Sequence, residues 1–221
     1  LVMSQWHVGL YPSLAGKMVV VGNGVDPTEF RRDDVKRDPR KFIWTSCPTR
    51  GLDVLLEAWP EILKALPNAT LDVYYGFEMV RAILPHKAKE EMAQLTEKIE
   101  KIEKLKDQEG VTWKGRVGHK EIAEAMLGAG VWCYPNETFP ELFGTSSVKA
   151  QAAGCWPVIY ERAGLAETVA WGWRSTKETL VRDCVEAALS LSDREPMRRW
   201  ACEVFDWERA AEQWEKLMEV P

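Results

Sequence analysis

Residues 131–160 read VWCYPNETFPELFGTSSVKAQAAGCWPVIY, and this stretch decides the fold. It begins with the apolar run Val131 to Tyr134 and ends with the apolar run Pro157 to Tyr160, both of strand length. Between them, Thr145 to Ala153 is typical of a helix, and a loop that contains Gly144 precedes it. A strand, a helix and a second strand in this order predict a parallel pair with a crossover helix.

The same alternation extends outward over the chain. Further strand-like runs lie at residues 18–22, 41–46, 70–75 and 111–113. Further helical patterns lie at residues 51–66, 86–108, 120–128, 176–191, 194–203 and 206–219. The pattern predicts an α/β fold, Rossmann-like, in which a parallel sheet has helices on both faces and forms three layers. Such sheets bind ligands at the carboxyl ends of their strands.

Three segments are expected along the chain. Residues 1–17 form no obvious unit of their own and are interpreted as the remnant of, or a linker from, a preceding N-terminal domain. Residues 18–205 form the ligand-binding domain, and residues 206–221 form a C-terminal helix.

The composition excludes several classes of function. The net charge of −5 argues against a nucleic-acid partner. No apolar run approaches the roughly 20 residues of a transmembrane segment. Five cysteines without a Cys-x-x-Cys pair are interpreted as free thiols in a reducing, cytoplasmic setting. The histidines do not cluster with cysteines or carboxylates, so no metal site is expected.

Two loops carry residues that suit a phosphorylated ligand. Arg50 stands at the start of the helix at 51–66, where free N–H groups and a permanent positive charge suit a phosphate. Glu141 precedes the helix that begins near Thr145, and Lys149 lies one turn inside it. A carboxylate beside a phosphate-binding helix terminus is better suited to ligand hydroxyls. Taken alone, an arginine at a helix start is more often a surface residue, and Glu141 is equally compatible with a solvated loop carboxylate.

A third loop, Gly110 to Gly118, contains Arg116 and Val117 after a short strand. The backbone groups along its edge are candidates for contacts with a planar nucleotide base, although the pattern is weak in isolation.

Together these loops resemble the C-terminal, donor-binding domain of the retaining GT-B glycosyltransferases of family four. The resemblance covers about residues 18–215. The matching motifs are Asn23-Gly24-Val25-Asp26 with Phe30, Arg50-Gly51, Glu141, Phe143-Gly144, Lys149-Ala150 and Gly154 to Val158.

The resemblance implies a role for each matching residue. Arg50, with Gly51, binds the pyrophosphate of a nucleotide-sugar donor, and Glu141 contacts the transferred sugar as the candidate catalytic residue. The other donor-binding residues that we expect are Phe143, Gly144, Thr145, Lys149, Arg116, Val117 and Gly24.

The sequence departs from the family at two positions. Lys149 stands where the family has a second Glu that bonds the ribose, and Thr45 stands where it often has an arginine. A lysine cannot accept a hydrogen bond from a ribose hydroxyl. We hypothesise that Lys149 instead replaces the missing cationic phosphate contact.

The resemblance therefore implies transfer of a hexose-type sugar from a nucleotide-diphospho-sugar to an acceptor, with retention and without metal or cofactor. The acceptor is expected to bind through an N-terminal domain that these residues do not contain, so the isolated domain is expected to be inactive. A membrane contact, where there is one, would lie in that other domain.

Two other functions are alternatives. A non-catalytic nucleotide-sugar-binding or interaction module on the same fold remains open, because of Lys149 and the missing half. A dehydrogenase would need Gly-x-Gly-x-x-Gly after the first strand, and the stretch Gly22-Asn23-Gly24 has no third glycine in place.

Overall fold

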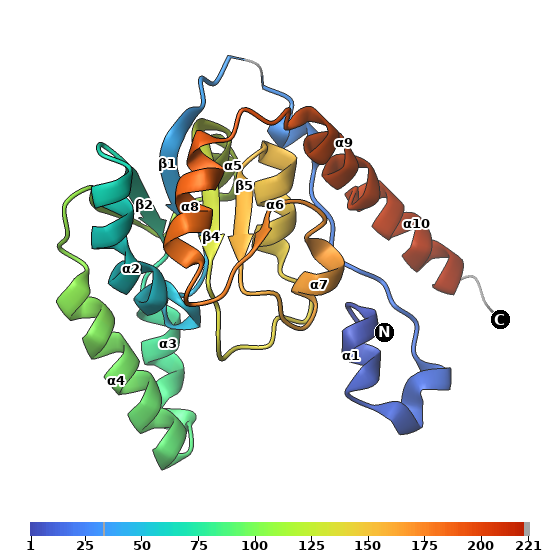
Figure 1. Ribbon diagram of the computed structural model, residues 1–221. Coiled ribbons are helices and arrows are strands. Elements are labelled where there is room, and N and C mark those ends of the chain that lie inside the picture. Colours follow the sequence, from blue (N-terminus) through green and yellow to red (C-terminus); the bar gives the residue numbers. More distant parts are fainter. Residues whose placement is uncertain (33, 219–221) are drawn as a thin grey trace.

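A single six-stranded sheet organises the protein, whose computed structural model describes residues 1–32 and 34–218. Every pair of neighbouring strands is parallel, in the order β3-β2-β1-β4-β5-β6 (Figure 1). The strands are β1 (Asp38–Trp44), β2 (Thr70–Tyr74), β3 (Val111–Gly115), β4 (Ala129–Tyr134), β5 (Trp156–Ile159) and β6 (Trp173–Arg174). This order is that of a Rossmann-like sheet, and the predicted fold class is confirmed.

Helices cover both faces of the sheet, as predicted. One face carries α2 (Leu52–Ala65) and α8 (Leu180–Leu189), with α4 (Lys89–Leu105) packed outside α2. The other face carries α5 (His119–Gly128) and α6 (Thr145–Ala153).

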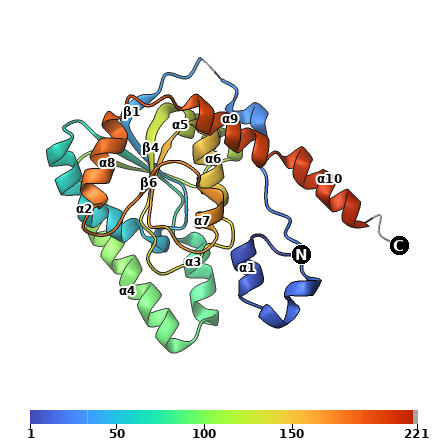
Figure 2. The same cartoon turned by 45° about the vertical axis from the view of Figure 1, so that its right-hand side comes forward.

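The remaining helices lie around this three-layer body. They are α1 (Gln5–Gly9), α3 (Glu78–Ile83), α7 (Leu165–Thr168), α9 (Glu195–Val204) and α10 (Trp207–Met218), with 3₁₀ turns at Pro12–Lys17, Pro27–Phe30, Pro48–Arg50 and Leu84–His86. Helix α9 packs on α6, and α10 continues from it away from the body (Figure 2).

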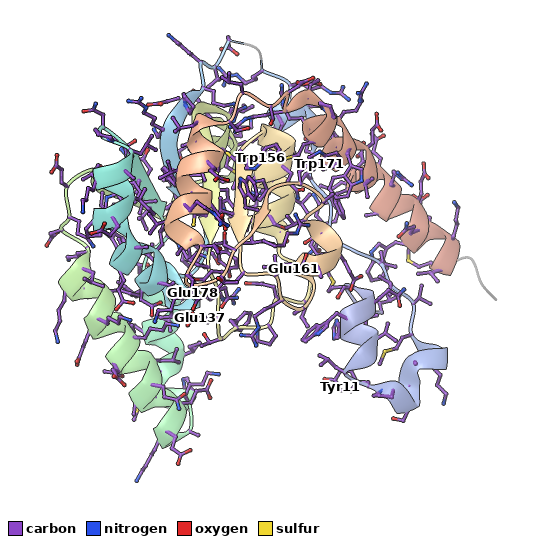
Figure 3. The ribbon with its side chains drawn as sticks, in the orientation of Figure 1. Tyr11, Glu137, Trp156, Glu161, Trp171 and Glu178 are labelled. Carbon is purple, nitrogen blue, oxygen red and sulfur yellow. The ribbon has the colours of Figure 1, made fainter. Side chains whose placement is uncertain are left out.

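The central strands are buried on both faces, which explains their unbroken apolar sequences. All six residues of β4 are buried, and so are Phe42, Ile43 and Trp44 at the end of β1. Because the strands are parallel, the loops that follow them share one edge of the sheet. Figure 3 shows Glu137 and Glu161, from the loops after β4 and β5, near this lower edge, and Trp156, at the start of β5, far above it.

The expected strand at residues 18–22 is wrong. Val20 makes only an isolated bridge to Val2, and Val19 is 42% exposed. The apolar run pairs with the N-terminal segment and not with the sheet, where β1 occupies the place beside β4. The short elements β6 and α3 were missed, because two and six residues are too few to show a period.

Both terminal segments that the sequence sets apart, residues 1–17 and 206–221, are described at least in part. Within residues 1–17, the backbone N–H groups of Gln5 and Trp6 donate to Glu167 at 2.9 and 2.7 Å, which ties α1 to α7. Helix α10 lies in the expected C-terminal segment, of which residues 219–221 fall outside the described part. The division of the chain into three segments stays a prediction.

A buried carboxylate on α8 joins this helix to the loop after β6. Asp183 is 1% exposed and accepts hydrogen bonds from Ser175 and Thr179, each at 2.7 Å, and from Arg182 at 2.7 Å. Burial raises the pKa of Asp183, but the hydrogen bonds from Thr179, Ser175 and Arg182 outweigh it and hold the pKa below its usual value.

We predict that Asp183→Asn lowers the free energy of unfolding at neutral pH by about 1–3 kcal/mol, because it unbalances a buried hydrogen-bond network. Since the folded-state pKa is depressed, the stabilisation is fully present above the unfolded-state pKa and is lost as the pH falls through the folded-state value. Urea midpoints measured over a pH series should therefore show a difference from the native protein that shrinks under acid conditions. The exposed Glu203→Gln on α9 is the control, and a difference that grows on acidification would contradict this account.

Candidate functional site

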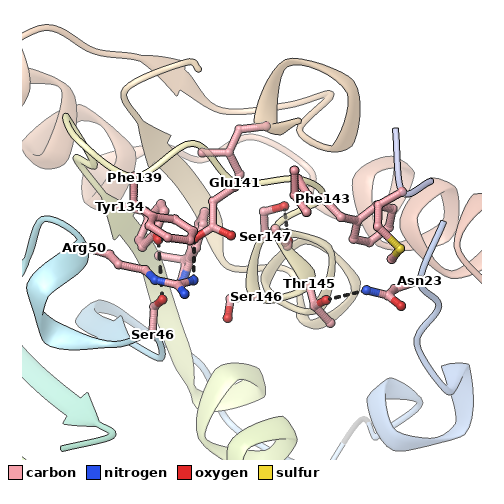
Figure 4. A pocket seen from close by; sticks show the side chains of 15 residues that line it. Asn23, Ser46, Arg50, Tyr134, Phe139, Glu141, Phe143, Thr145, Ser146 and Ser147 are labelled. Atoms are coloured by element: carbon pink, nitrogen blue, oxygen red, sulfur yellow. Dashed lines mark hydrogen bonds and ion pairs between the residues drawn. The ribbon is translucent and has the colours of Figure 1, made fainter. Parts of the chain in front are cut away.

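A cavity opens where the order of the strands reverses, between the carboxyl ends of β1 and β4. It has a volume of about 400 Å³ and is called the central cavity below (Figure 4). The chain leaves β1 toward α2 on one face and leaves β4 toward α6 on the other, so the two loops diverge and leave a crevice. Ligands of doubly wound sheets bind at this place.

Arg50 enters the cavity from the β1 side. It ends the turn Pro48–Arg50, and Gly51 then adopts φ +110°, a left-handed conformation that favours glycine. A Cβ on Gly51 would lie 2.6 Å from the carbonyl oxygen of Pro135, so a side chain here would push the β1 and β4 loops apart. The Arg50 guanidinium lies 3.7 Å from the centre of the Phe139 ring and donates to Glu141 Oε1 at 2.9 Å (Figure 4).

Glu141 enters from the β4 side and is held by two donors. Its side chain is 13% exposed, and Oε1 also accepts the Tyr134 hydroxyl at 2.6 Å. Burial and then the Glu141 carboxylate raise the pKa of Tyr134, which keeps this phenol protonated as a donor. Both bonds go to Oε1, and among the described residues no donor reaches Oε2. One carboxylate oxygen therefore remains available to a ligand.

The first turn of α6 forms the third wall. Gly144 has φ +83°, and a Cβ there would lie 2.6 Å from Leu165. Among the described residues no side chain caps this helix, and the Ser147 N–H donates to the Gly144 carbonyl oxygen. The N–H groups of Thr145 and Ser146 and the positive end of the helix dipole are therefore available beside the cavity. Thr145 accepts from Asn23 Nδ2 at 3.3 Å, and Ser146 Oγ donates to the Thr45 carbonyl oxygen at 3.1 Å. An anion is the ligand that such a turn favours.

Five of the residues expected at the site line this cavity. They are Arg50, Glu141, Phe143, Gly144 and Thr145. Phe143 also forms the wall toward α9, where its ring packs edge-on against Phe205 at 5.6 Å between ring centres.

The other expected residues lie elsewhere. Gly51 does not line the cavity but shapes the turn that carries Arg50. Gly24 packs against α10, because a Cβ there would lie 2.8 Å from Trp207 Cα. Arg116 and Val117 lie in the loop after β3, where the Arg116 guanidinium is 5.7 Å from the Tyr75 ring centre.

Lys149 faces away from the central cavity toward the start of α5. Its Nζ lies 3.0 Å from His119 Nδ1. Burial lowers the pKa of Lys149, and the opposing charge of Glu29 raises it by less. Lys149 and His119 thus present nitrogen donors beside the loop after β3, whereas a Glu at this position would present acceptors.

Several lining residues were missed from the sequence. Ser46, Tyr134 and Phe139 were not singled out, although all three belong to the two loops that were. Tyr134 ends β4 and Ser46 follows β1 closely, whereas Phe139 lies further along the β4 loop. Trp132 lines the cavity from β4, stacked on Tyr134, and its indole N–H has no partner among the described residues. Tyr134 could have been identified from the sequence, because it stands directly at the carboxyl end of a predicted strand, where ligands of such sheets bind.

Two further features are absent from the described part of the chain. No group of three or more His, Cys, Asp and Glu side chains is arranged there as metal ligands. None of the helices in that part combines the length and the apolar character needed to cross a bilayer.

Comparison with known proteins places this geometry in a family. The model of the family described as glycosyl transferases group 1 matches residues 42–199, more than half of the chain. No curated protein matches the sequence.

Solved structures show the same fold at low identity. HepE from Anabaena, solved in complex with UDP and glucose, has a TM-score of 0.73 at 16% identity, over 100% of this chain and 62% of that one. Sucrose-phosphate synthase from Thermosynechococcus elongatus has a TM-score of 0.68 at 17% identity, over 98% and 56%. TarM from S. aureus has 0.68 at 13%, over 99% and 43%. The chain thus spans about half the length of these proteins.

We predict that Gly51→Ala destabilises the fold by roughly 1–3 kcal/mol, because alanine is strained at this φ and its Cβ meets the Pro135 carbonyl. Gly16→Ala is the control, since a Cβ there meets open space. The measurement is the urea midpoint of both variants. Equal midpoints would show that the β1 and β4 loops do not depend on close approach at Gly51.

Proposed function

The chain belongs to the glycosyl transferases group 1 family, and we propose that it binds the nucleotide-diphospho-sugar donor of a GT-B glycosyltransferase. One observation carries the proposal: Arg50 and Glu141 meet 2.9 Å apart in a cavity walled by the uncapped start of α6. This combination offers a cation, a helix dipole and a free carboxylate oxygen to one ligand. A diphosphate attached to a sugar has the matching charge and hydroxyl groups.

The diphosphate would lie between Arg50 and the first turn of α6. Arg50 uses one Nη atom for Glu141, and its guanidinium has further N–H donors in the same plane. It can therefore keep Glu141 in place while it binds a phosphate oxygen. The backbone at Thr145 and Ser146 adds N–H donors and the dipole. When the sugar leaves, these fixed donors stabilise the charge that develops on the diphosphate, and we propose that no metal ion is required.

The sugar would lie against Glu141. Its Oε2 is free to accept hydrogen bonds from sugar hydroxyls, while Arg50 and Tyr134 fix the carboxylate through Oε1. Glu141 would thereby orient the sugar ring in the cavity. A hexose as the transferred sugar, and retention at its anomeric carbon, are proposed from the resemblance in the motif that contains Glu141.

The nucleoside would extend toward the loop after β3. Backbone groups at Arg116 and Val117 would meet the base, and Lys149 with His119 would lie on the ribose side. The presence of UDP in the HepE complex makes a uridine nucleotide the first candidate. The acceptor would bind through residues of a further, N-terminal domain, because the similar structures are longer than this chain. We propose a cytoplasmic enzyme with any membrane contact in that domain.

A non-catalytic nucleotide-sugar-binding module is the second candidate. Lys149 favours it, because a lysine, whose Nζ lies 3.0 Å from His119 Nδ1, stands where the family places a carboxylate. Donor hydrolysis or sugar transfer by the chain joined to its N-terminal domain would distinguish the enzyme. Donor binding without turnover in that longer protein would identify the module.

We predict that Arg50→Ala weakens the binding of a nucleoside diphosphate about ten- to a hundredfold, because a charged hydrogen bond contributes about 1.5–3 kcal/mol. Calorimetric titration with a panel of nucleoside diphosphates measures this and names the base. The matched control is Arg40→Ala, an exposed arginine near the opposite end of β1. Equal loss of affinity in both variants would contradict the assignment of Arg50 to diphosphate binding.

We also predict that Lys149→Glu weakens the same binding roughly tenfold, because it replaces a cation on the proposed nucleoside path by an anion. Lys120→Glu makes the same change of net charge on an exposed position of α5 and should have little effect. Unchanged affinity in Lys149→Glu would remove Lys149 from the donor site.

A further inference from the structure

The first part of the loop after β4 folds back on Arg50 at both of its ends. At its start it lies against Gly51, where an added Cβ would be 2.9 Å from Asn136 Cα. At its far end, the Phe139 ring lies over the Arg50 guanidinium, 3.7 Å from the ring centre (Figure 4). Residues 135–139, called the β4 turn below, therefore hold Arg50 and its neighbour between them.

Asn136 gives the β4 turn its shape. The residue is 1% exposed, and its Oδ1 accepts the backbone N–H groups of Thr138 at 3.3 Å and Phe139 at 3.0 Å. Its Nδ2 donates to the Phe139 carbonyl oxygen. An amide can accept and donate at one place, and a buried amide without such partners would cost stability. All three bonds go to the backbone around Phe139, so Asn136 determines where that ring can lie.

The Phe139 ring restricts a side chain that is otherwise long and flexible. The Arg50 side chain is 33% exposed, and an arginine at a surface samples many rotamers that it must give up when it binds a ligand. The ring covers one face of the guanidinium, while Glu141 accepts from Nη1 at 2.9 Å. The other N–H donors lie along the edge of the guanidinium, which the stacked ring does not cover. Arg50 is therefore ordered before a ligand arrives.

Burial of the ring does not account for this arrangement. Phe139 is 41% exposed, so it contributes little to the apolar core. Arg50 already has a carboxylate partner in Glu141 and does not need the ring to balance its charge. Both Phe139 and Arg50 line the central cavity. A role of the ring in orienting the guanidinium explains these observations together.

We propose that Asn136 and Phe139 are positioning residues of the donor site. Asn136 shapes the β4 turn, the turn places the Phe139 ring, and the ring orients Arg50 toward the diphosphate. The order of Arg50 in the free chain is a property of the fold alone. Its consequence for binding rests on the proposed function.

Calorimetric titration with UDP tests this consequence. Phe139→Leu should weaken binding about three- to tenfold, the loss expected when one flexible side chain has to be ordered on binding. Phe139→Tyr keeps an aromatic ring and should bind as the native chain does. Thr138→Ala removes an exposed side chain from the same turn but none of its backbone bonds, and should also bind normally. Native affinity in Phe139→Leu, or an equal loss in Thr138→Ala, would overturn the proposal.

Double variants show whether Phe139 acts through Arg50. In an Arg50→Ala background, Phe139→Leu should cause no further loss, because the side chain that it orients is gone. Asn136→Ala should weaken binding as Phe139→Leu does, and the two together should lose no more than either alone. Urea midpoints show that each variant is folded. A further loss of the same size in the Arg50→Ala background would mean that Phe139 does not act through Arg50, which contradicts the proposal.

Side-chain NMR of the free chain separates this inference from the proposed function. The Arg50 Nε–H signal, identified by its loss in Arg50→Ala, should have a high order parameter in the native chain and in Phe139→Tyr. It should become mobile in Phe139→Leu and Asn136→Ala. Unchanged order in both of these variants would remove the positioning role, whether or not UDP binds. An ordered Arg50 that depends on Phe139, in a chain that binds no nucleoside diphosphate, would support the orientation and contradict the proposed function.

Discussion

The hydrogen-bonded pairing of β1 with β4 is the constraint on which the rest of the site depends. Phe42 pairs with Val131 and Ile43 with Trp132, so both strands end at the same height in the sheet. The helices that follow them lie on opposite faces. The two loops must therefore start together and then separate, and the crevice between them follows from topology before any side chain is chosen.

The side chains in this crevice are arranged for a ligand more than for stability. The Arg50 side chain is 33% exposed and that of Glu141 is 13% exposed, so part of each charge is removed from water. The attraction in such a pair is largely offset by this desolvation, and replacement by apolar residues is often neutral or stabilising. The start of α6 adds N–H groups that no side chain in the described part of the chain satisfies.

The sequence was sufficient for the central sheet and for placing Arg50 and Glu141 in loops that follow strands of that sheet. Unbroken apolar runs such as residues 131–134 are specific to strands covered on both faces, and the carboxyl ends of parallel strands share one edge. Residues 18–22 show the limit of that argument, because an apolar run does not show which segment it will pair with. The direction of a side chain is also absent from the pattern. Tyr134 turns toward Glu141, and Lys149 toward His119, because of packing among residues distant in sequence.

Arg50 enters the central cavity as one rigid group. Its guanidinium is held in plane by the Phe139 ring at 3.7 Å and by Glu141 at 2.9 Å, so its remaining donors cannot reorient independently. A ligand oxygen that binds to them meets donors whose direction is already fixed, so less side-chain entropy is lost on binding than at a free surface arginine. The Arg50–Glu141 pair adds little to stability, and its effect is to keep the cation in one place in the cavity.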